Sequence, residues 1–213
     1  MNVYFAEFAA FAVANTLCLI SPGPDFAMIV RSSLRNGRRT AIFVGFGIAL
    51  GEMMHMTYTI LGLGVVLNES ETLMSTIKYI GAAYLLYLGI QSLRAKKAPA
   101  QAGEASAILP TITPLKAIRA GFLTNALNAK AAFLTMSIFT VLVSSATPFW
   151  VKTIYGVFNV TTTFAWFALV ATFLTSELLQ ARFFAIKHWI ERVTGAILIA
   201  LALQLAFGEM AML

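Results

Sequence analysis

Ionisable residues that lie inside otherwise apolar stretches of the chain are the first candidates for chemistry. They are Asp25, Glu52, His55 and Lys130. A charged side chain inside a bilayer costs on the order of a few kcal/mol, so it needs a partner, a water-filled cavity or a function. Because the set carries both signs, it suits the binding of a small charged solute or the relay of protons.

The segment Ser21-Pro22-Gly23-Pro24-Asp25 predicts a break in the helix that contains it. Its two prolines remove two backbone donors, and Gly23 permits torsions that other residues avoid. A break frees carbonyl groups before it and N–H groups after it, so that the positive end of the second half-helix faces whatever lies there. Pro22, Gly23, Pro24 and Asp25 are therefore candidates for a solute-binding site. The alternative is a simple kink, or a helix that begins at the membrane interface with Asp25 as its N-cap.

Glu52 and His55 are three residues apart and share one face of a helix. They are candidates for proton coupling because histidine titrates near neutral pH, and the alternative is a structural hydrogen-bonded pair. Di-iron bundles also use Glu-x-x-His, but they need two copies and further glutamates, and this chain has one copy. We expect no metal site and no cofactor. Gly47 and Gly51 form a small-xxx-small face that favours close helix packing.

Lys130 lies deep in its apolar stretch, near the middle of the membrane at about 1.5 Å of rise per residue. A lysine side chain does not reach across half a bilayer, so we expect it to face the protein interior with Asp25 or Glu52 as partner. A buried structural ion pair is the alternative. Asn125 and Asn128 precede it and offer amide hydrogen bonds either to a solute or between helices.

The composition places these residues in a membrane. Of the 213 residues, 59% are hydrophobic and 11% are charged, against about 45–50% and about 25% in soluble domains. This excludes a water-soluble enzyme and a disordered chain. The single cysteine, Cys18, excludes an intramolecular disulfide and a cysteine-based metal cluster. The net charge of +6 predicts no nucleic-acid partner, because the basic residues lie in short loops between apolar stretches.

Six apolar stretches are long enough to cross a bilayer, which takes about 20 helical residues. They are 4–30, 41–67, 72–93, 115–143, 148–174 and 187–207. We expect the first to be retained rather than cleaved as a signal, since its start holds Glu7 and no basic residue. Twelve of the 15 basic residues fall in the first, third and fifth loops. The positive-inside rule therefore places these loops in the cytoplasm and both termini on the outer, periplasmic side.

The two halves of the chain are weakly similar to each other. Segment 96–114 is rich in Ala and Pro and reads as a cytoplasmic linker between repeat 1–95 and repeat 115–213 of a single membrane domain. A basic residue, then Gly-Ala three residues later, occurs at Lys78 with Gly81-Ala82 and at Arg192 with Gly195-Ala196. Three spans per half invert the second half relative to the first, as in many secondary transporters. The predicted fold is an all-α integral membrane protein with six transmembrane helices as a 3+3 inverted repeat and a broken first helix.

The ordered set of motifs resembles the LysE/RhtB family of bacterial amino-acid exporters over nearly the whole chain. The motifs are Ser21-Pro22-Gly23-Pro24-Asp25, Gly37-Arg38-Arg39, His55 with Leu61-Gly62-Leu63, Gly81-Ala82-Ala83-Tyr84-Leu85, Gly121-Phe122-Leu123 and Asn128-Ala129-Lys130. The resemblance carries over Pro22, Pro24, Asp25, Asn128 and Lys130 as transport-site positions. One position departs from the family pattern, which is usually Asn-Pro-Lys: Ala129 stands where the family has proline. This predicts a less broken fourth helix and an altered choice of substrate.

The resemblance implies a secondary transporter, not an enzyme, that exports amino acids or close derivatives across the bacterial inner membrane and is driven by the proton gradient. Lys130 and the half-helix after Pro24 would hold the carboxylate of the amino acid, and Asp25 or Glu52 its ammonium group. Glu52 and His55 would couple protons. The alternatives are a membrane scaffold or sensor without solute flux, and an intramembrane enzyme. The identity of the amino acid, the coupling stoichiometry and a homodimeric state are left open.

Overall fold

The structure is a computed structural model that describes residues 2–69, 71–94, 112–173 and 177–207. Every regular element in these ranges is an α-helix. The helices are α1 (Asn2–Ile20), α2 (Pro24–Glu69), α3 (Glu71–Leu93), α4 (Pro114–Ala126), α5 (Ala129–Leu142), α6 (Phe149–Phe173) and α7 (Glu177–Phe207). The predicted linker 96–114 lies outside the described residues as far as residue 111.

Helices of membrane-spanning length and composition occur within the described residues. Pro24–Gly62 and Phe149–Phe173 each meet both criteria, and α4 with α5 meets them as a pair bent by 60°. Tyr4–Ile20 and Tyr79–Leu93 are shorter apolar helices. The predicted all-helical membrane class is therefore supported, while the six-span inverted repeat stays a prediction.

The break in the first apolar stretch is confirmed. Residues 21–23 separate α1 from α2, and Pro24 takes the first position of α2, where a missing N–H leaves nothing unpaired. The carbonyl of Gly23 accepts the first hydrogen bond of α2, from Ala27 N at 2.9 Å. Gly23 does not use the torsional freedom expected of it, because Gly37 alone has a positive φ among the described residues.

Gly37 bends α2. Other residues would adopt its φ of 80° and ψ of 169° only with strain. These torsions divide α2 into segments 24–36 and 38–69. The first segment completes the first apolar stretch, and the second contains the second stretch. The predicted loop between these stretches is thus a single-residue turn at Gly37, next to Arg38 and Arg39.

The fourth stretch is also broken, and the prediction of a less broken helix is wrong. The backbone of Asn128 is extended (φ −83°, ψ 96°), and its side-chain oxygen caps α5 by accepting from Lys130 N at 3.1 Å. Ala129 is then the first residue of α5, where the N–H has no partner inside the helix. Proline is favoured at the first position of a helix, but the break forms without it.

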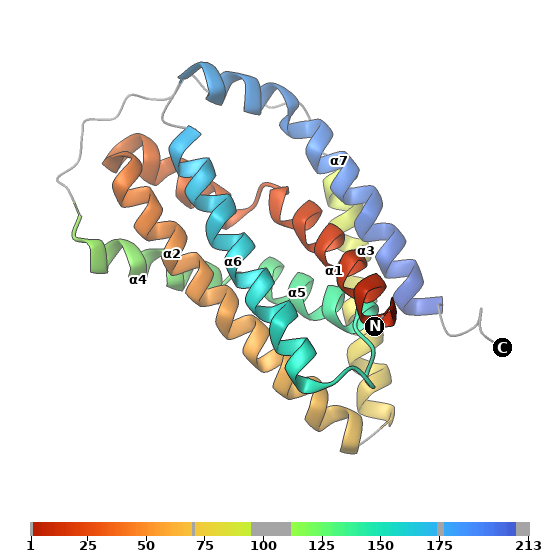
Figure 1. Cartoon of the computed structure of the whole chain (residues 1–213). Coiled ribbons are helices and arrows are strands. Elements are labelled where there is room, and N and C mark those ends of the chain that lie inside the picture. Colours follow the sequence, from red (N-terminus) through yellow and green to blue (C-terminus); the bar gives the residue numbers. More distant parts are fainter. Residues whose placement is uncertain (1, 70, 95–111, 174–176, 208–213) are drawn as a thin grey trace.

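Helix pairs separated in sequence form the body of the protein. α2 lies against α6 and α4, and α3 lies against α7, with α1 and α5 between them (Figure 1). A Cβ atom on Gly47 would overlap the carbonyl oxygen of Ile118, and one on Gly121 would overlap that of Val44. The backbones of α2 and α4 therefore touch, as the glycine pattern at Gly47 and Gly51 predicts.

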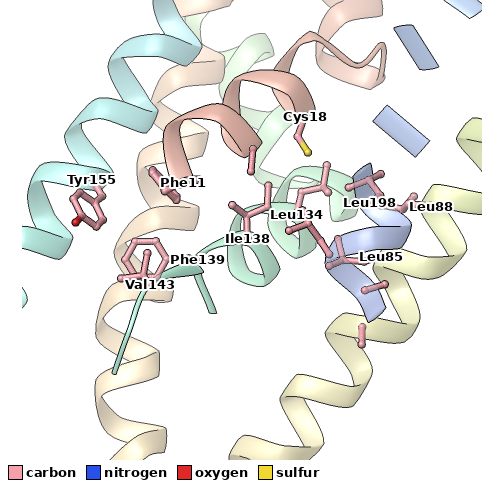
Figure 2. Close-up of a cluster of buried hydrophobic side chains, with 14 of the residues drawn as sticks. Phe11, Cys18, Leu85, Leu88, Leu134, Ile138, Phe139, Val143, Tyr155 and Leu198 are labelled. Carbon is pink, nitrogen blue, oxygen red and sulfur yellow. The ribbon is translucent and has the colours of Figure 1, made fainter. Parts of the chain in front are cut away.

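An apolar cluster joins six helices around residues 11–18 of α1, with Met56 as the contribution of α2. Figure 2 shows side chains from α1, α3, α5, α6 and α7 converging on it. The ring of Phe11 lies 5.8 Å from the ring of Phe139 and stacks at 5.8 Å on that of Tyr155. Nearby, the carboxylate of Glu7 accepts from Thr147 Oγ1 at 2.9 Å. The start of α1 is therefore fixed to the loop between α5 and α6.

The position of Ala129 gives a test of how the second break is made. We expect Ala129→Pro to keep or raise the stability of the purified protein in detergent, by up to about 1 kcal/mol, because proline fits this position and restricts the unfolded chain. Ala132→Pro is the matched control, because Ala132 N donates to Asn128 O at 3.1 Å. That substitution should cost roughly 3 kcal/mol. Thermal unfolding of both variants measures this, and an equal loss in both would contradict the assignment of Ala129 to the first position.

Candidate functional site

The two helix breaks lie against each other, and each binds a charged side chain from the helix that follows the other break. Lys130, the second residue of α5, donates from Nζ to Ser21 Oγ at 3.0 Å and to Pro22 O at 3.1 Å. Asp25, the second residue of α2, accepts at Oδ2 from Asn125 Nδ2 at 3.0 Å and from Asn128 Nδ2 at 2.9 Å. Each half-helix thus supplies a charged group to the break of the other.

Helix dipoles explain part of this arrangement. Asp25 lies at the positive end of α2, where a carboxylate is stabilised. Lys130 lies at the positive end of α5, where a cation is disfavoured, but it reaches Pro22 O, a carbonyl group in the break between α1 and α2. Asp25 and Lys130 are also close enough to interact electrostatically.

A cavity of about 70 Å³ lies beside the breaks. One water needs about 10–15 Å³ of such a volume, so the cavity has room for several waters or a small solute. Its polar walls include Asp25, Glu52, Asn128 and Lys130. Gly23 also lines it, and a Cβ atom added to Gly23 would lie 3.5 Å from Lys130 Nζ. The second carboxylate oxygen of Asp25, Oδ1, is buried without a hydrogen-bond partner. A cationic donor in the cavity would satisfy it.

The predicted site residues are mostly brought together. Pro22, Gly23, Pro24 and Asp25 form the first break, and Asn125, Asn128 and Lys130 surround the second. The two breaks are separated by about a hundred residues of sequence and meet only through the packing of α1 and α2 on α4 and α5.

Glu52 and His55 are buried on the same face of α2, as predicted, but they bind different partners. Glu52 Oε1 accepts from Thr135 Oγ1 on α5 at 2.6 Å, and Glu52 lines the cavity. His55 Nε2 lies 2.9 Å from Asn125 O, and its Nδ1 lies 2.7 Å from the hydroxyl of Tyr58. Since Asn125 also binds Asp25, it links His55 to the first break.

Several polar residues of the site were not found by sequence reasoning. Ser21, Thr135 and Tyr58 bind the predicted residues directly, and Asn15 and Thr163 line the cavity. Asn15 also accepts at Oδ1 from Asn159 Nδ2 at 2.9 Å. The available signal was an uncharged amide inside an apolar stretch, since such a group also needs a partner in a membrane.

A helical membrane protein that places a polar cavity between two broken helices has the architecture of a solute translocator. The comparison with known proteins gives the family: the chain belongs to the LysE type translocator family, whose family model matches residues 16–209. The resemblance read from the sequence is therefore confirmed, and the chain is a multi-pass membrane protein.

Curated relatives cover most of the chain. It is 28% identical over 208 residues to the threonine efflux protein of Escherichia coli (strain K12), which covers 95% of this chain and 98% of that protein. It is 26% identical over 192 residues to the uncharacterized membrane protein YahN of the same organism, covering 90% and 85%. It is 39% identical to the uncharacterized membrane protein YrhP of Bacillus subtilis (strain 168), over 87 residues, or 41% of each chain. No solved structure matches.

The two roles of Asn128 can be separated by mutation. Asn128→Ala removes the cap of α5 and the hydrogen bond to Asp25, for a combined loss of about 2.5–4 kcal/mol of stability. Asn128→Ser keeps a capping oxygen but does not reach Asp25, so it should lose about 1.5–3 kcal/mol. Thermal unfolding in detergent compares the two variants. A serine variant as stable as the wild type would mean that the bond between Asn128 and Asp25 contributes nothing.

Proposed function

We propose that the chain is a secondary transporter that exports amino acids or close derivatives across the bacterial inner membrane, driven by the proton gradient. The observation that carries this proposal is the pair of opposite charges at the two breaks, since Asp25 and Lys130 line one cavity and Asp25 Oδ1 is buried without a hydrogen-bond partner. An amino acid carries the matching ammonium and carboxylate groups. The similarity to the threonine efflux protein of Escherichia coli supports the same class of solute.

The bound solute has one arrangement that satisfies both charges. Its ammonium group donates to Asp25 Oδ1, and its carboxylate accepts from Lys130 Nζ near the positive end of α5, where an anion is favoured. The corresponding end of α2 already carries the negative charge of Asp25. When the carboxylate binds Lys130, it competes with Ser21 and Pro22 for the same ammonium. Binding therefore weakens the contact between the breaks, which provides a reason for a change of conformation.

The membrane topology of this proposal is the 3+3 inverted repeat with both termini outside. The two breaks support it, because they correspond position by position: Gly23 with Asn128, Pro24 with Ala129, and Asp25 with Lys130. The pairing of α3 with α7, the last helix of each half, is what a two-fold relation between the halves requires. The excess of basic residues in alternate loops supports the orientation.

Glu52 and His55 carry the proton in this proposal. Glu52 lines the cavity and bonds to α5, while His55 connects the half-exposed Tyr58 to Asn125 and through it to Asp25. A proton on Glu52 removes the negative charge that this residue places at the wall of the cavity. Export of the solute and import of the proton are then linked through one cavity.

The first experiment is flux in liposomes that contain the purified protein. Labelled threonine and a panel of other amino acids should accumulate against their gradient when a proton gradient is imposed. Lys130→Ala should reduce this flux at least tenfold, because the carboxylate loses its charged partner. Lys152→Ala is the matched control, since Lys152 Nζ donates to Ser145 O at an exposed site. Normal flux by a well-inserted Lys130→Ala protein would refute the binding mode, and no flux of any amino acid by the wild type would refute the transport of amino acids.

The coupling role of Glu52 has its own test. Glu52→Gln keeps an oxygen for Thr135 but cannot release or take up a proton. We expect downhill flux of the amino acid to persist at a rate within about threefold of the wild type, and acceleration by the proton gradient to disappear. Measurement of flux with and without a pH difference across the liposome membrane decides this. Flux that still rises with the gradient in the variant would exclude Glu52 as the coupling residue.

A further inference from the structure

The cavity is lined by a second residue with an unpartnered polar atom, Asn15 on α1. Asn15 is 9% exposed, lines the cavity, and has no hydrogen-bond partner for its amino group, Nδ2. A buried amide N–H without a partner costs on the order of 1–3 kcal/mol. Among the residues that line the cavity, the buried polar atoms without a partner are thus one acceptor, Asp25 Oδ1, and one donor, Asn15 Nδ2.

The orientation of the Asn15 amide is fixed from α6. Its oxygen accepts from Asn159 Nδ2 at 2.9 Å, and the side chain of Asn159 also interacts with the carboxylate of Glu52. Asn159 thus offers its amino group to two oxygens, which favours this orientation of both amides. Because Asn159 occupies its oxygen, Asn15 keeps its amino group available as a donor beside the cavity that it lines.

The distance along α1 suits a small solute. Asn15 precedes Ser21 by six residues, which is about 9 Å along a helix axis. A three- or four-carbon amino acid with a hydrogen bond at each end has a similar length. Besides its polar residues, the cavity is lined by apolar side chains and by a single thiol, that of Cys18. The apolar wall residues are Leu19, Phe26, Leu134, Ile138 and Phe167.

We propose that Asn15 is a specificity-determining residue: its amino group donates to a hydroxyl oxygen on the side chain of the solute. This inference rests on the proposed function and narrows its substrate to short, uncharged amino acids that carry a hydroxyl group. An apolar solute of the same shape would leave Asn15 Nδ2 buried and unpaired, and a site built for a hydroxyl group discriminates strongly against such an analogue. A longer side chain would meet the apolar wall residues, and a charged one would be buried beside them.

Isosteric pairs of solutes test the inference. In proteoliposomes, threonine should be exported at least about tenfold more efficiently than valine, and serine more efficiently than alanine, at equal concentration and gradient. Asn15→Leu should reduce the preference for threonine over valine to within about twofold, through slower export of threonine and faster export of valine. Thr163→Val is the matched control, because it removes a hydroxyl group that also lines the cavity, on α6, and leaves Asn15 in place. It should keep the preference.

Cys18 provides a readout that does not depend on flux or on the stability of a variant. It is the one cysteine of the chain and lines the cavity, so reaction with a small methanethiosulfonate reagent reports on occupancy. In the wild type, threonine should slow this reaction at a concentration at least about tenfold lower than valine requires.

The outcomes separate this inference from the proposed function. Equal export of threonine and valine by the wild type, or equal protection of Cys18 by both, would overturn the role of Asn15 and leave amino-acid export intact. A preference that survives Asn15→Leu but is lost in Thr163→Val would move the specificity to Thr163 and also overturn it. Absence of flux and of protection for every amino acid would overturn the proposed function itself.

Discussion

The reciprocal pairing of two helix breaks is the interaction on which the rest of the structure depends. A break in a bilayer exposes carbonyl and N–H groups that no lipid can satisfy. Here neither break is satisfied by its own helix alone. Lys130 binds the end of α1 and Asp25 binds the amides that flank the start of α5, so that each break is completed only when the other lies beside it. The formation of the site and the packing of the two halves therefore depend on the same contacts.

Helix packing places one residue, Asn125, in contact with both Asp25 and His55. Gly51 allows α4 to approach so closely that a Cβ atom on it would lie 2.6 Å from Asn125 Oδ1. From this position the amide of Asn125 reaches Asp25, and its backbone carbonyl reaches His55. A glycine that reads as a packing residue in the sequence thus also determines which polar groups meet.

The sequence predicts what is local and misses what depends on contacts across the fold. Two prolines are sufficient to predict the first break, and the apolar surroundings of Lys130 are sufficient to predict that it faces inward. The second break was missed because it depends on Asn128 as a helix cap, which the reading based on proline did not consider. The hydrogen bond of Lys130 to Ser21 joins residues 109 positions apart, and no periodic pattern indicates such a pair. Asn15 and Asn159 were missed because uncharged amides were considered only close to an ionisable residue, as Asn125 and Asn128 are close to Lys130.

Ala129 makes the two breaks unequal in their hydrogen-bonding capacity. The first residue of α2 is Pro24, which has no N–H, whereas the first residue of α5 is an alanine, which retains one. The α5 end therefore offers an additional donor at a position where anions are favoured, next to the cation of Lys130. The α2 end offers a carboxylate instead. Although the breaks correspond in position, the space between them has a negative pole and a positive pole. A zwitterion placed there has one preferred direction rather than two equivalent ones.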